Sequence, residues 1–374
     1  MATTTGPLVI IDGHNLFIRN YVRSPYTDAN GERAGGTTGM IVSVRKLIND
    51  FGASNCLVVW DGEGGSQRRR SIYKEYKAGR KVRLNEEYDF GETPEKRMEN
   101  MRHQRNVSSE YLGMLGVPQV RADNVEADDL MAFIAGKMNH EGGCIIVTTD
   151  QDLLQLIRTA GSFDAECTSD LHVMKGTENI CSVCHATERS EVRVWSPIKK
   201  ILYDRTKFIS DYGVLPENFR LVKALTGDSS DNIEGIKGFG DKTVAKSFPF
   251  LLTKFSKAED ILEAASKLKG VIGKRLIDEK SRFLENLQLV DLSEPMLSAT
   301  AARVAREALY KDIGCHEVDF RVKIIRDAIS FKGDNFVTPF REFVMRRRKL
   351  LKQVVMPTDA ELLSIENAVE ENKE

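Results

Sequence analysis

Nine carboxylates recur at five places along the chain, each at the end of an apolar run, at the start of a helical pattern or in a Gly/Ser-rich loop. They are Asp12; Asp61; Glu126, Asp128 and Asp129; Asp150 and Asp152; and Asp228 and Asp231. Gathered into one pocket, these acids could not all stay ionised beside each other without a compensating charge. Mg²⁺ or Mn²⁺ supplies that charge and prefers oxygen ligands. The pattern predicts a metal-dependent enzyme.

Two-metal hydrolysis of a phosphodiester is the chemistry that suits such a pocket. One ion lowers the pKa of an attacking water, the other stabilises the leaving oxygen, and both neutralise charge on the phosphate. This chemistry needs no His or Cys nucleophile, and the sequence offers His14 no triad partner, which favours a structural role for it. Any single acidic motif has a structural alternative, because acids in a first helical turn are stabilised by the helix dipole.

The elements that must position these acids are short apolar runs separated by helical patterns. Residues 8–12, 57–61 and 144–150 predict buried strands that each end on an aspartate, and residues 38–51 and 127–138 predict helices between them. This alternation indicates a parallel α/β sheet. Ligand chemistry in such sheets lies at the carboxyl ends of the strands. The aspartates therefore stand where they could converge.

From about residue 214 the pattern becomes helical, with predicted helices at 218–226, 242–248, 259–268 and 280–290. Residues 235–243 resemble a phosphate-binding P-loop, but Asp241 follows Gly240 where that motif needs Lys. A helix–hairpin–helix turn fits better, because its glycines let backbone N–H groups approach a DNA phosphate. Its predicted DNA-binding residues are Gly235, Gly238, Gly240 and Lys242. An ordinary Gly-rich turn is the alternative.

Charge is spread unevenly over the 374 residues, whose net charge is only −1. Between Arg68 and Arg83 there are eight Lys/Arg and one acid, with Tyr73 and Tyr76 among them. Such a stretch, including Arg68, Arg69 and Arg70, suits phosphate contact and base stacking. A solvated helix face is the alternative. A second basic segment, 340–351, precedes an acidic tail; it could lie on duplex DNA, bind a protein partner or be a solvated helix.

The composition is otherwise that of an ordinary soluble protein with room for two domains, 41% hydrophobic and 29% charged. No apolar run approaches the roughly 20 residues of a membrane span, and no secretory signal is visible, so we expect a cytoplasmic protein. A disulfide framework is then not expected. Cys56 and Cys144 lie in apolar runs and are predicted to be buried thiols.

Six segments together resemble the 5′-nuclease superfamily, which comprises flap endonucleases, phage 5′–3′ exonucleases and the 5′-nuclease domain of bacterial DNA polymerase I. The likeness is greatest to the phage enzymes, including those called phage RNase H. The matching segments are residues 9–13, 59–62, 73–80, 126–129, 149–152 and 226–233. They follow the family order over about residues 8–292.

This resemblance implies a PIN-like, mostly parallel central sheet flanked by helices, with a helical arch at about residues 66–105. It divides the chain into an α/β nuclease core at 1–213, a helical helix–hairpin–helix (H3TH) subdomain at 214–299 and a C-terminal extension at 300–374. The implied activity is that of a divalent-metal-dependent, structure-selective 5′-nuclease, acting as flap endonuclease and 5′–3′ exonuclease. Its substrates would be 5′ flaps, nicked DNA or RNA primers during DNA replication.

The resemblance also implies roles for individual residues. Five acids would serve the catalytic ion and four the second ion; these are Asp12, Asp61, Glu126, Asp128 and Asp129, then Asp150, Asp152, Asp228 and Asp231. Tyr76, Lys77 and Arg80 would lie near the scissile phosphate, with Lys77 stabilising developing charge. A K⁺ ion would be held by backbone carbonyls of residues 235–240. The expected partners are forked, flap or nicked DNA, RNA–DNA hybrids, and a sliding clamp or single-strand-binding protein, for a monomer that is cytoplasmic in the host if phage-encoded.

The chain departs from the family in an insert at about residues 159–191, which holds Cys167, His172, Cys181 and Cys184. These four could form a structural zinc site of Cys₃His type, because a small insert without an apolar core needs another source of stability. His185 suits the site less, since it directly follows Cys184. An exposed loop with neighbouring thiols is the alternative.

Two other functions compete with the nuclease. A PIN-class ribonuclease shares the acidic pocket but usually lacks the hairpin of residues 235–240. A non-catalytic DNA-binding scaffold on the same fold would have lost some of the acids, and none of the nine expected positions is lost.

Overall fold

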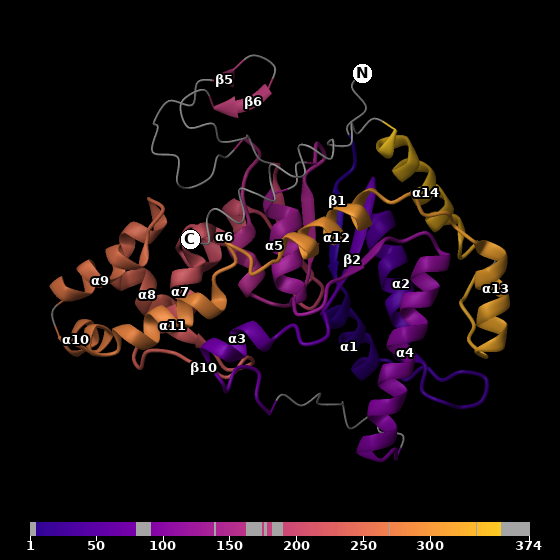
Figure 1. Ribbon diagram of the computed structural model, residues 1–374, viewed down its shortest axis with the longest axis horizontal. Helices are drawn as coiled ribbons and strands as arrows, with labels where there is room; N and C mark the ends of the chain where they lie inside the picture. Colours follow the sequence, from indigo (N-terminus) through magenta and orange to yellow (C-terminus); the bar gives the residue numbers. More distant parts are fainter. Residues whose placement is uncertain are drawn as a thin grey trace. The chain divides into compact units, whose positions relative to one another are not determined.

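The computed structural model describes residues 5–79, 91–137, 140–161, 174–175, 178–181, 190–268, 270–333 and 335–352 (Figure 1). The chain forms two compact units. The first unit comprises Met1–Gly62, Arg83–Val125 and Leu297–Glu374, and the second comprises Glu63–Val82 and Glu126–Met296. The three-part division inferred from the family resemblance stays a prediction.

In the first unit, three parallel strands lie in the order β3-β2-β1. They are β1 (Leu8–Asp12), β2 (Asn55–Trp60) and β3 (Gln119–Arg121), and every residue of β1 and β2 is buried. Strands covered on both faces read as continuous apolar runs, which is why the sequence predicted both strands. The strand predicted at 57–61 starts two residues earlier and ends at Trp60, before Asp61. Asp12 lies opposite Val59 in the ladder, so β1 and β2 end at the same edge.

Helices cover these strands. They are α1 (Gly13–Arg23), α2 (Gly35–Asp50), α4 (Pro94–Met114), α12 (Ala299–Tyr310), α13 (Glu317–Arg326) and α14 (Thr338–Leu351). Helix α2 packs against both α1 and α4. Asp12 caps α1 by accepting a hydrogen bond from the backbone N–H of Asn15, and Thr93 caps α4 in the same way. The predicted helix at 38–51 is confirmed with an earlier start.

The C-terminal extension packs into the core of the first unit. Arg347 of α14 is only 1% exposed, and it donates hydrogen bonds to Asn55 Oδ1 of β2 and to the Leu309 carbonyl, both at 2.8 Å. The Tyr111 hydroxyl of α4 donates to Asp327 at 2.7 Å. Helix α14 is therefore anchored in the first unit and is not merely a solvated helix.

The second unit contains the other strands. Strands β4 (Cys144–Val147) and β7 (Val192–Ser196) pair parallel, and β8 (Ile201–Tyr203) joins β7 antiparallel. Two hairpins complete it, β5 (Met174–Lys175) with β6 (Glu178–Cys181) and β9 (Gly227–Asp228) with β10 (Ile233–Glu234). The strand predicted at 144–150 ends at Val147, because Asp150 donates its N–H to the Thr148 hydroxyl in a turn.

Most of the second unit is helical. Its helices are α3 (Gln67–Ile72), α5 (Ala127–Lys137), α6 (Arg205–Tyr212), α7 (Phe219–Thr226), α8 (Asp241–Ser247), α9 (Ala258–Lys267), α10 (Val271–Asp278) and α11 (Lys280–Val290). Short 3₁₀ turns, η2 (Asp152–Leu156), η3 (Pro216–Asn218) and η4 (Pro249–Leu252), connect them. The helices predicted from residue 214 onward are confirmed within one residue at each end. The fold class, a mostly parallel sheet flanked by helices, is confirmed.

Cys56 and Cys144 are buried free thiols as predicted, and burial raises the pKa of each to about 12. The predicted zinc ligands Cys167, His172 and Cys184 lie outside the described residues, and only the backbone of Cys181 is described, in β6. The zinc site therefore stays a prediction. None of the described helices has the length and apolar character needed to cross a membrane.

Candidate active site

The nine predicted acids are divided between the two units. Asp12 and Asp61 belong to the first unit, at the end of β1 and directly after β2. Asp12 is buried and caps α1, whereas Asp61 is exposed. Because β1 and β2 are parallel neighbours, both carboxylates stand at the carboxyl edge of this sheet, as the sequence predicted.

In the second unit, Glu126 is the centre of a first acidic cluster, which we call the Glu126 cluster (Glu126, Asp129 and Asp231 with Arg69, Tyr76 and Lys77). The Glu126 side chain is buried ahead of α5. Its Oε1 accepts from the Lys77 ammonium at 2.8 Å, and its Oε2 accepts from the Tyr76 hydroxyl at 3.1 Å. Tyr76 also donates to Asp231 at 3.2 Å, and Lys77 Nζ lies 3.7 Å from the same carboxylate. Tyr76 and Lys77, predicted from the resemblance, are thus brought together with two predicted metal ligands.

Arg69 occupies the inner side of this cluster. Its Nη1 lies 2.6 Å from both Glu126 Oε2 and Asp129 Oδ2, and its Nη2 donates to Asp129 Oδ1 at 3.1 Å. Its Nε donates to the Leu289 carbonyl, and Asp129 Oδ1 also accepts the backbone N–H of Met296. Predicted as a DNA-binding residue, Arg69 is instead buried among carboxylates, with 3% of its side chain exposed. Both oxygens of Asp129 are occupied by protein donors.

These contacts fix the charges in the Glu126 cluster. Burial opposes the charge of Lys77, but the Glu126 carboxylate prevails and raises the pKa of the ammonium. Burial also opposes ionisation of Glu126, and Lys77 and Arg69 hold its pKa below the usual range. Burial raises the pKa of Tyr76, so its hydroxyl remains a donor. Asp128, in the first turn of α5, contributes to the raised pKa of Lys77.

Backbone contacts hold Tyr76 and Lys77 in place. Lys77 has a φ of 52°, in the left-handed region that costs energy for a residue with a side chain. Its N–H donates to the Asp231 carbonyl at 2.9 Å, and the Asn232 amide donates to the Glu75 carbonyl. The segment after α3 is therefore attached to the β9–β10 loop. Arg80, the third predicted catalytic residue, lies outside the described residues.

A second acidic cluster surrounds Lys223 of α7, and we call it the Lys223 cluster (Asp150, Asp152 and Asp228 with Lys223). Lys223 Nζ lies 2.6 Å from Asp228 Oδ2 and 3.1 Å from Asp152 Oδ1. Burial raises the pKa of Asp152 to about 7, and the charges of Asp150 and Asp228 add to the shift. Burial also opposes ionisation of Asp228, but Lys223 holds its pKa below the usual range. This cluster combines three of the four acids predicted for the second ion; the fourth, Asp231, belongs to the Glu126 cluster.

The donor set of both clusters suits a hard divalent cation, although lysine and arginine side chains lie between the acids. Arg69, Lys77 and Lys223 each bridge two carboxylates. In the part of the chain that the structure describes, no three His, Cys, Asp or Glu side chains are grouped closely enough for one metal ion. Asp152 Oδ1 nevertheless accepts no well-aligned hydrogen bond although it is buried. A buried, underused carboxylate oxygen beside two further acids fits a divalent ion that would take over part of the role of Lys223.

The predicted DNA-binding residues lie in two segments of the second unit. Arg68 and Arg70 are exposed on α3. In the hairpin, Gly238 has a φ of 103°, and a Cβ on Gly235 would lie 2.1 Å from the Thr226 carbonyl oxygen, so both positions require glycine. Gly240 precedes α8, on which Lys242 is exposed. The Lys237 carbonyl of the predicted K⁺ site accepts from Arg275 at 2.6 Å.

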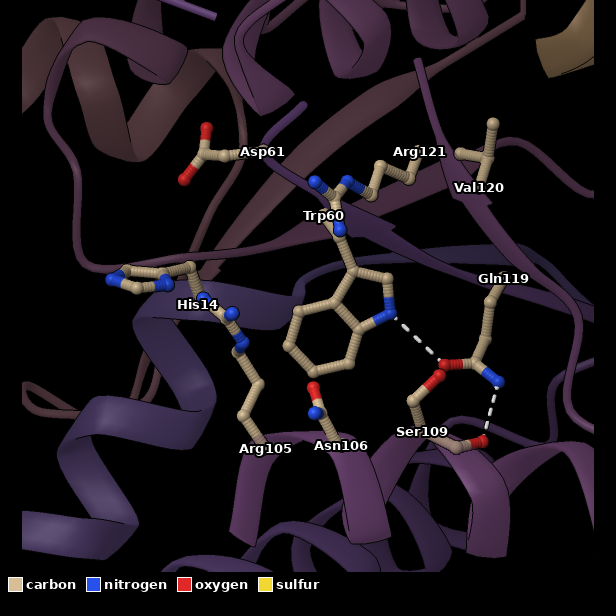
Figure 2. Close-up of a pocket in the computed structure, with 9 residues that line it drawn as sticks. All are labelled: His14, Trp60, Asp61, Arg105, Asn106, Ser109, Gln119, Val120 and Arg121. Carbon is tan, nitrogen blue, oxygen red and sulfur yellow. Dashed lines mark hydrogen bonds between the residues drawn. The ribbon is translucent and has the colours of Figure 1, made fainter. Parts of the chain in front are cut away.

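The first unit has a cavity beside Asp61 that the sequence did not reveal (Figure 2). It measures about 210 Å³ and is lined by His14, Trp60, Asp61, Arg105, Asn106, Ser109, Gln119, Val120 and Arg121. The Trp60 indole donates to Gln119 Oε1 at 2.9 Å, and Gln119 donates to the Ser109 carbonyl at 2.8 Å, as the dashed lines in Figure 2 show. The position of Arg121 at the end of β3 is the one sequence signal that could have pointed to this site.

Comparison with protein families gives two matches in order along the chain. Residues 7–181 match the N-terminal resolvase-like domain of 5′-3′ exonucleases, and residues 214–308 match their C-terminal SAM fold. The chain belongs to the 5′-3′ exonuclease family. This family member is therefore a 5′-nuclease. Strands β1 to β6 lie within the first matched segment, and helices α7 to α11 lie within the second.

Relatives of this 5′-3′ exonuclease family member include free-standing enzymes and parts of polymerases. It is 28% identical over 267 residues to the 5′-3′ exonuclease of Halalkalibacterium halodurans, a match of 68% of this chain and 74% of the relative. It is 28% identical over 274 residues to the thermostable DNA polymerase I of Thermus aquaticus, covering 73% of this chain but only 27% of the polymerase. The fold resembles that of the bacteriophage T5 flap endonuclease, solved with DNA and metal ions, at a TM-score of 0.54 and 22% identity, over 86% of this chain and 99% of the other.

Proposed function

We propose that this protein uses two divalent ions to cut phosphodiesters of 5′ flaps and of nicked DNA, with RNA primers as further substrates. The observation that carries the proposal is that seven acids, four of them buried, lie with three bridging cations within one unit. Repulsion among so many ionised carboxylates raises the free energy of the folded protein unless cations balance their charge. Phosphodiester hydrolysis by two ions requires a site of this kind. The T5 enzyme, whose fold is similar, was solved with DNA and metal ions.

The acids take different roles in this proposal. Asp12, Asp61, Glu126 and Asp128 would hold the catalytic ion, and Asp150, Asp152, Asp228 and Asp231 the second ion. When bound, the ions would activate a water and neutralise the charge of the phosphate. Asp129 is the exception, because its oxygens already accept from Arg69 and from the Met296 backbone. We assign Asp129 the task of holding Arg69, which in turn orients Glu126.

Lys77 supplies a mobile positive charge to the reaction. Its ammonium is 16% exposed, stays protonated and is held by Glu126 and Asp231. Glu126 and Asp231 would hold divalent ions, and Lys77, with its contacts to them weakened, would then donate to a phosphate oxygen as negative charge develops. Tyr76 remains protonated and keeps a donor directed at the same carboxylates. Arg80 would add a second cation to the phosphate.

DNA would be positioned by surfaces outside the two clusters. Gly238 and Gly240 are exposed, and their backbone N–H groups would contact phosphates together with the side chains of Lys242, Arg68 and Arg70. A K⁺ ion at the hairpin would have to share the Lys237 carbonyl with Arg275. A clamp or single-strand-binding protein is a further proposed partner in replication.

Cleavage of a 5′-labelled flap duplex tests this function. With Mg²⁺ or Mn²⁺ we expect cuts near the junction of single strand and duplex, and with EDTA we expect none. DNA binding without cleavage in both metals would instead support a non-catalytic scaffold. A matched RNA-containing flap, run in parallel, tests whether primers are substrates.

A further inference from the structure

The cavity of the first unit places two arginines beside Asp61, and the reaction as proposed uses neither arginine. Two arginines and one aspartate are its charged lining residues: Arg105 of α4, Arg121 at the end of β3, and Asp61 after β2. Figure 2 shows Arg105 and Arg121 extending from different elements toward this cavity. With His14 neutral, the lining carries one net positive charge and so favours an anionic ligand.

The positive charge of Arg121 destabilises the charged form of Arg105, and a bound anion would offset this repulsion. Burial lowers the pKa of Arg105, and the neighbouring positive charges of Arg121 and Arg102 lower it further, whereas Asp61 only partly compensates. A guanidinium group binds phosphate oxygens through two parallel hydrogen bonds, a geometry that lysine cannot match. Two such groups facing one cavity therefore suit a phosphate better than a carboxylate.

The rest of the lining is suited to the neutral part of a nucleotide. Trp60 is mostly buried and is fixed by its bond to Gln119, so it forms a rigid apolar wall. Asn106 and Ser109 lie on the α4 side, and the exposed Asn106 amide offers both donors and acceptors to a base edge. A volume of about 210 Å³ admits a single unit of a strand but no duplex.

We propose that this cavity binds one unpaired nucleotide, with Arg105 and Arg121 contacting its phosphate and Asn106 contacting its base. This inference rests on the proposed nuclease function, because the substrate strand then supplies the ligand. Two sources share the chemistry: the 5′-phosphorylated end of the strand, and a free nucleoside monophosphate released by cleavage. The cavity thereby gives the enzyme a preference for strands that carry a 5′-phosphate.

The test uses Trp60 as a reporter, since the chain has two tryptophans and Trp195 lies in β7 of the other unit. In the Trp195→Phe protein, Trp60 emission is titrated in EDTA with deoxyadenosine monophosphate, with deoxyadenosine, and with three-nucleotide strands that have or lack a 5′-phosphate. We expect saturable changes with the phosphorylated ligands only. Arg105→Gln and Arg121→Gln should each weaken binding about tenfold, the effect of losing a charged hydrogen bond. Arg303→Gln, an exposed arginine of α12, should leave affinity unchanged.

The outcomes show which phosphorylated ligand the cavity binds, and whether it binds one at all. A response to the phosphorylated strand supports binding of the substrate end. A response to the monophosphate alone supports binding of the product and contradicts the preference for 5′-phosphorylated strands. No response to any phosphate, or equal affinity in the two arginine variants and the control, overturns the proposal. Flap cleavage by the same preparation in Mg²⁺ separates the hypotheses: cleavage without a Trp60 response rejects only the cavity, whereas no cleavage rejects the nuclease function.

Discussion

The acids of the second unit and those of the first are balanced by different means. In the second unit, Arg69 and Lys223 are buried and Lys77 is 16% exposed, and all three are bonded to carboxylates at 2.6–3.1 Å. In the first unit, Asp61 is exposed and lines an open cavity with two arginines. Buried charges must be paired inside the protein, whereas charges at a solvated cavity are screened by water and salt. The second unit therefore balances its acids with cations bonded to them, whereas the first unit places Asp61 at a solvated cavity beside two arginines.

The largest expected effect is a loss of cleavage caused by a change in the Lys223 cluster. Asp150→Asn removes one charge from the acids proposed for the second ion, and we expect cleavage to fall about a thousandfold, equivalent to roughly 4 kcal/mol of barrier. DNA affinity in EDTA should change little. Asp278→Asn, an exposed acid of α10 in the same unit, is the matched control. Equal losses of binding and cleavage would show that Asp150 is structural.

The second effect is on stability. Arg69→Gln leaves Glu126 and Asp129 buried without their cation, and we expect a loss of about 3 kcal/mol in the free energy of unfolding. Arg121→Gln at the open cavity of the first unit should cost about 0.5 kcal/mol or less. Urea denaturation in EDTA measures both. Equal losses of unfolding free energy in the two variants would show that the arginines of the two units do not differ in how strongly they stabilise the protein.

A double variant tests the role assigned to Asp129. If Asp129 mainly holds Arg69, then adding Asp129→Asn to Arg69→Gln should cost less than the sum of the single losses, with a coupling of about 1 kcal/mol or more. Strict additivity would instead return Asp129 to the group of proposed metal ligands.

The third effect is on the rate of the chemical step. Lys77→Gln should slow single-turnover cleavage about a hundredfold, typical of losing one donor to developing charge. The Mg²⁺ concentration needed for half-maximal rate should not rise, because the variant removes a cation that competes with the metal. Lys267→Gln, 72% exposed on α9, is the control. A higher Mg²⁺ requirement at an unchanged maximal rate would contradict the role of Lys77 as a donor.

The smallest effect is on the pH dependence of the metal-free protein. Asp152 has a folded pKa of about 7, above its unfolded value of about 4, so the folded state binds more protons between these pH values. Stability in EDTA should therefore fall as pH rises from about 4 to about 7, by at least about 1 kcal/mol, and Asp152→Asn should flatten this slope. Mg²⁺ affinity should rise over the same range. If stability still falls with pH in the Asp152→Asn protein, another titrating group causes the slope.

The sequence by itself determined the fold class and the identity of the acids. Strand β1 and helix α11 were predicted with the observed bounds, because their apolar residues follow a local period that burial on one or both faces imposes. Helix α4 gave no such signal, since its buried residues include Gln104 and Ser108 and its pattern is largely polar. The motifs around Asp12, Glu126 and Asp228 were readable because each is short and contiguous.

Only the tertiary structure decided how the charges are compensated. Arg69 contacts Asp129, which lies 60 residues later in the sequence, and Lys77 contacts Glu126, which lies 49 residues later. No local sequence pattern relates such distant partners. The same holds for Arg347, whose place in a basic segment suggested a surface role although it is buried against β2. The cavity of Arg105 and Arg121 likewise requires α4 and β3 to be packed together. Local periodicity specifies which residues are buried, whereas the pairing of buried charges depends on long-range packing that only the folded chain provides.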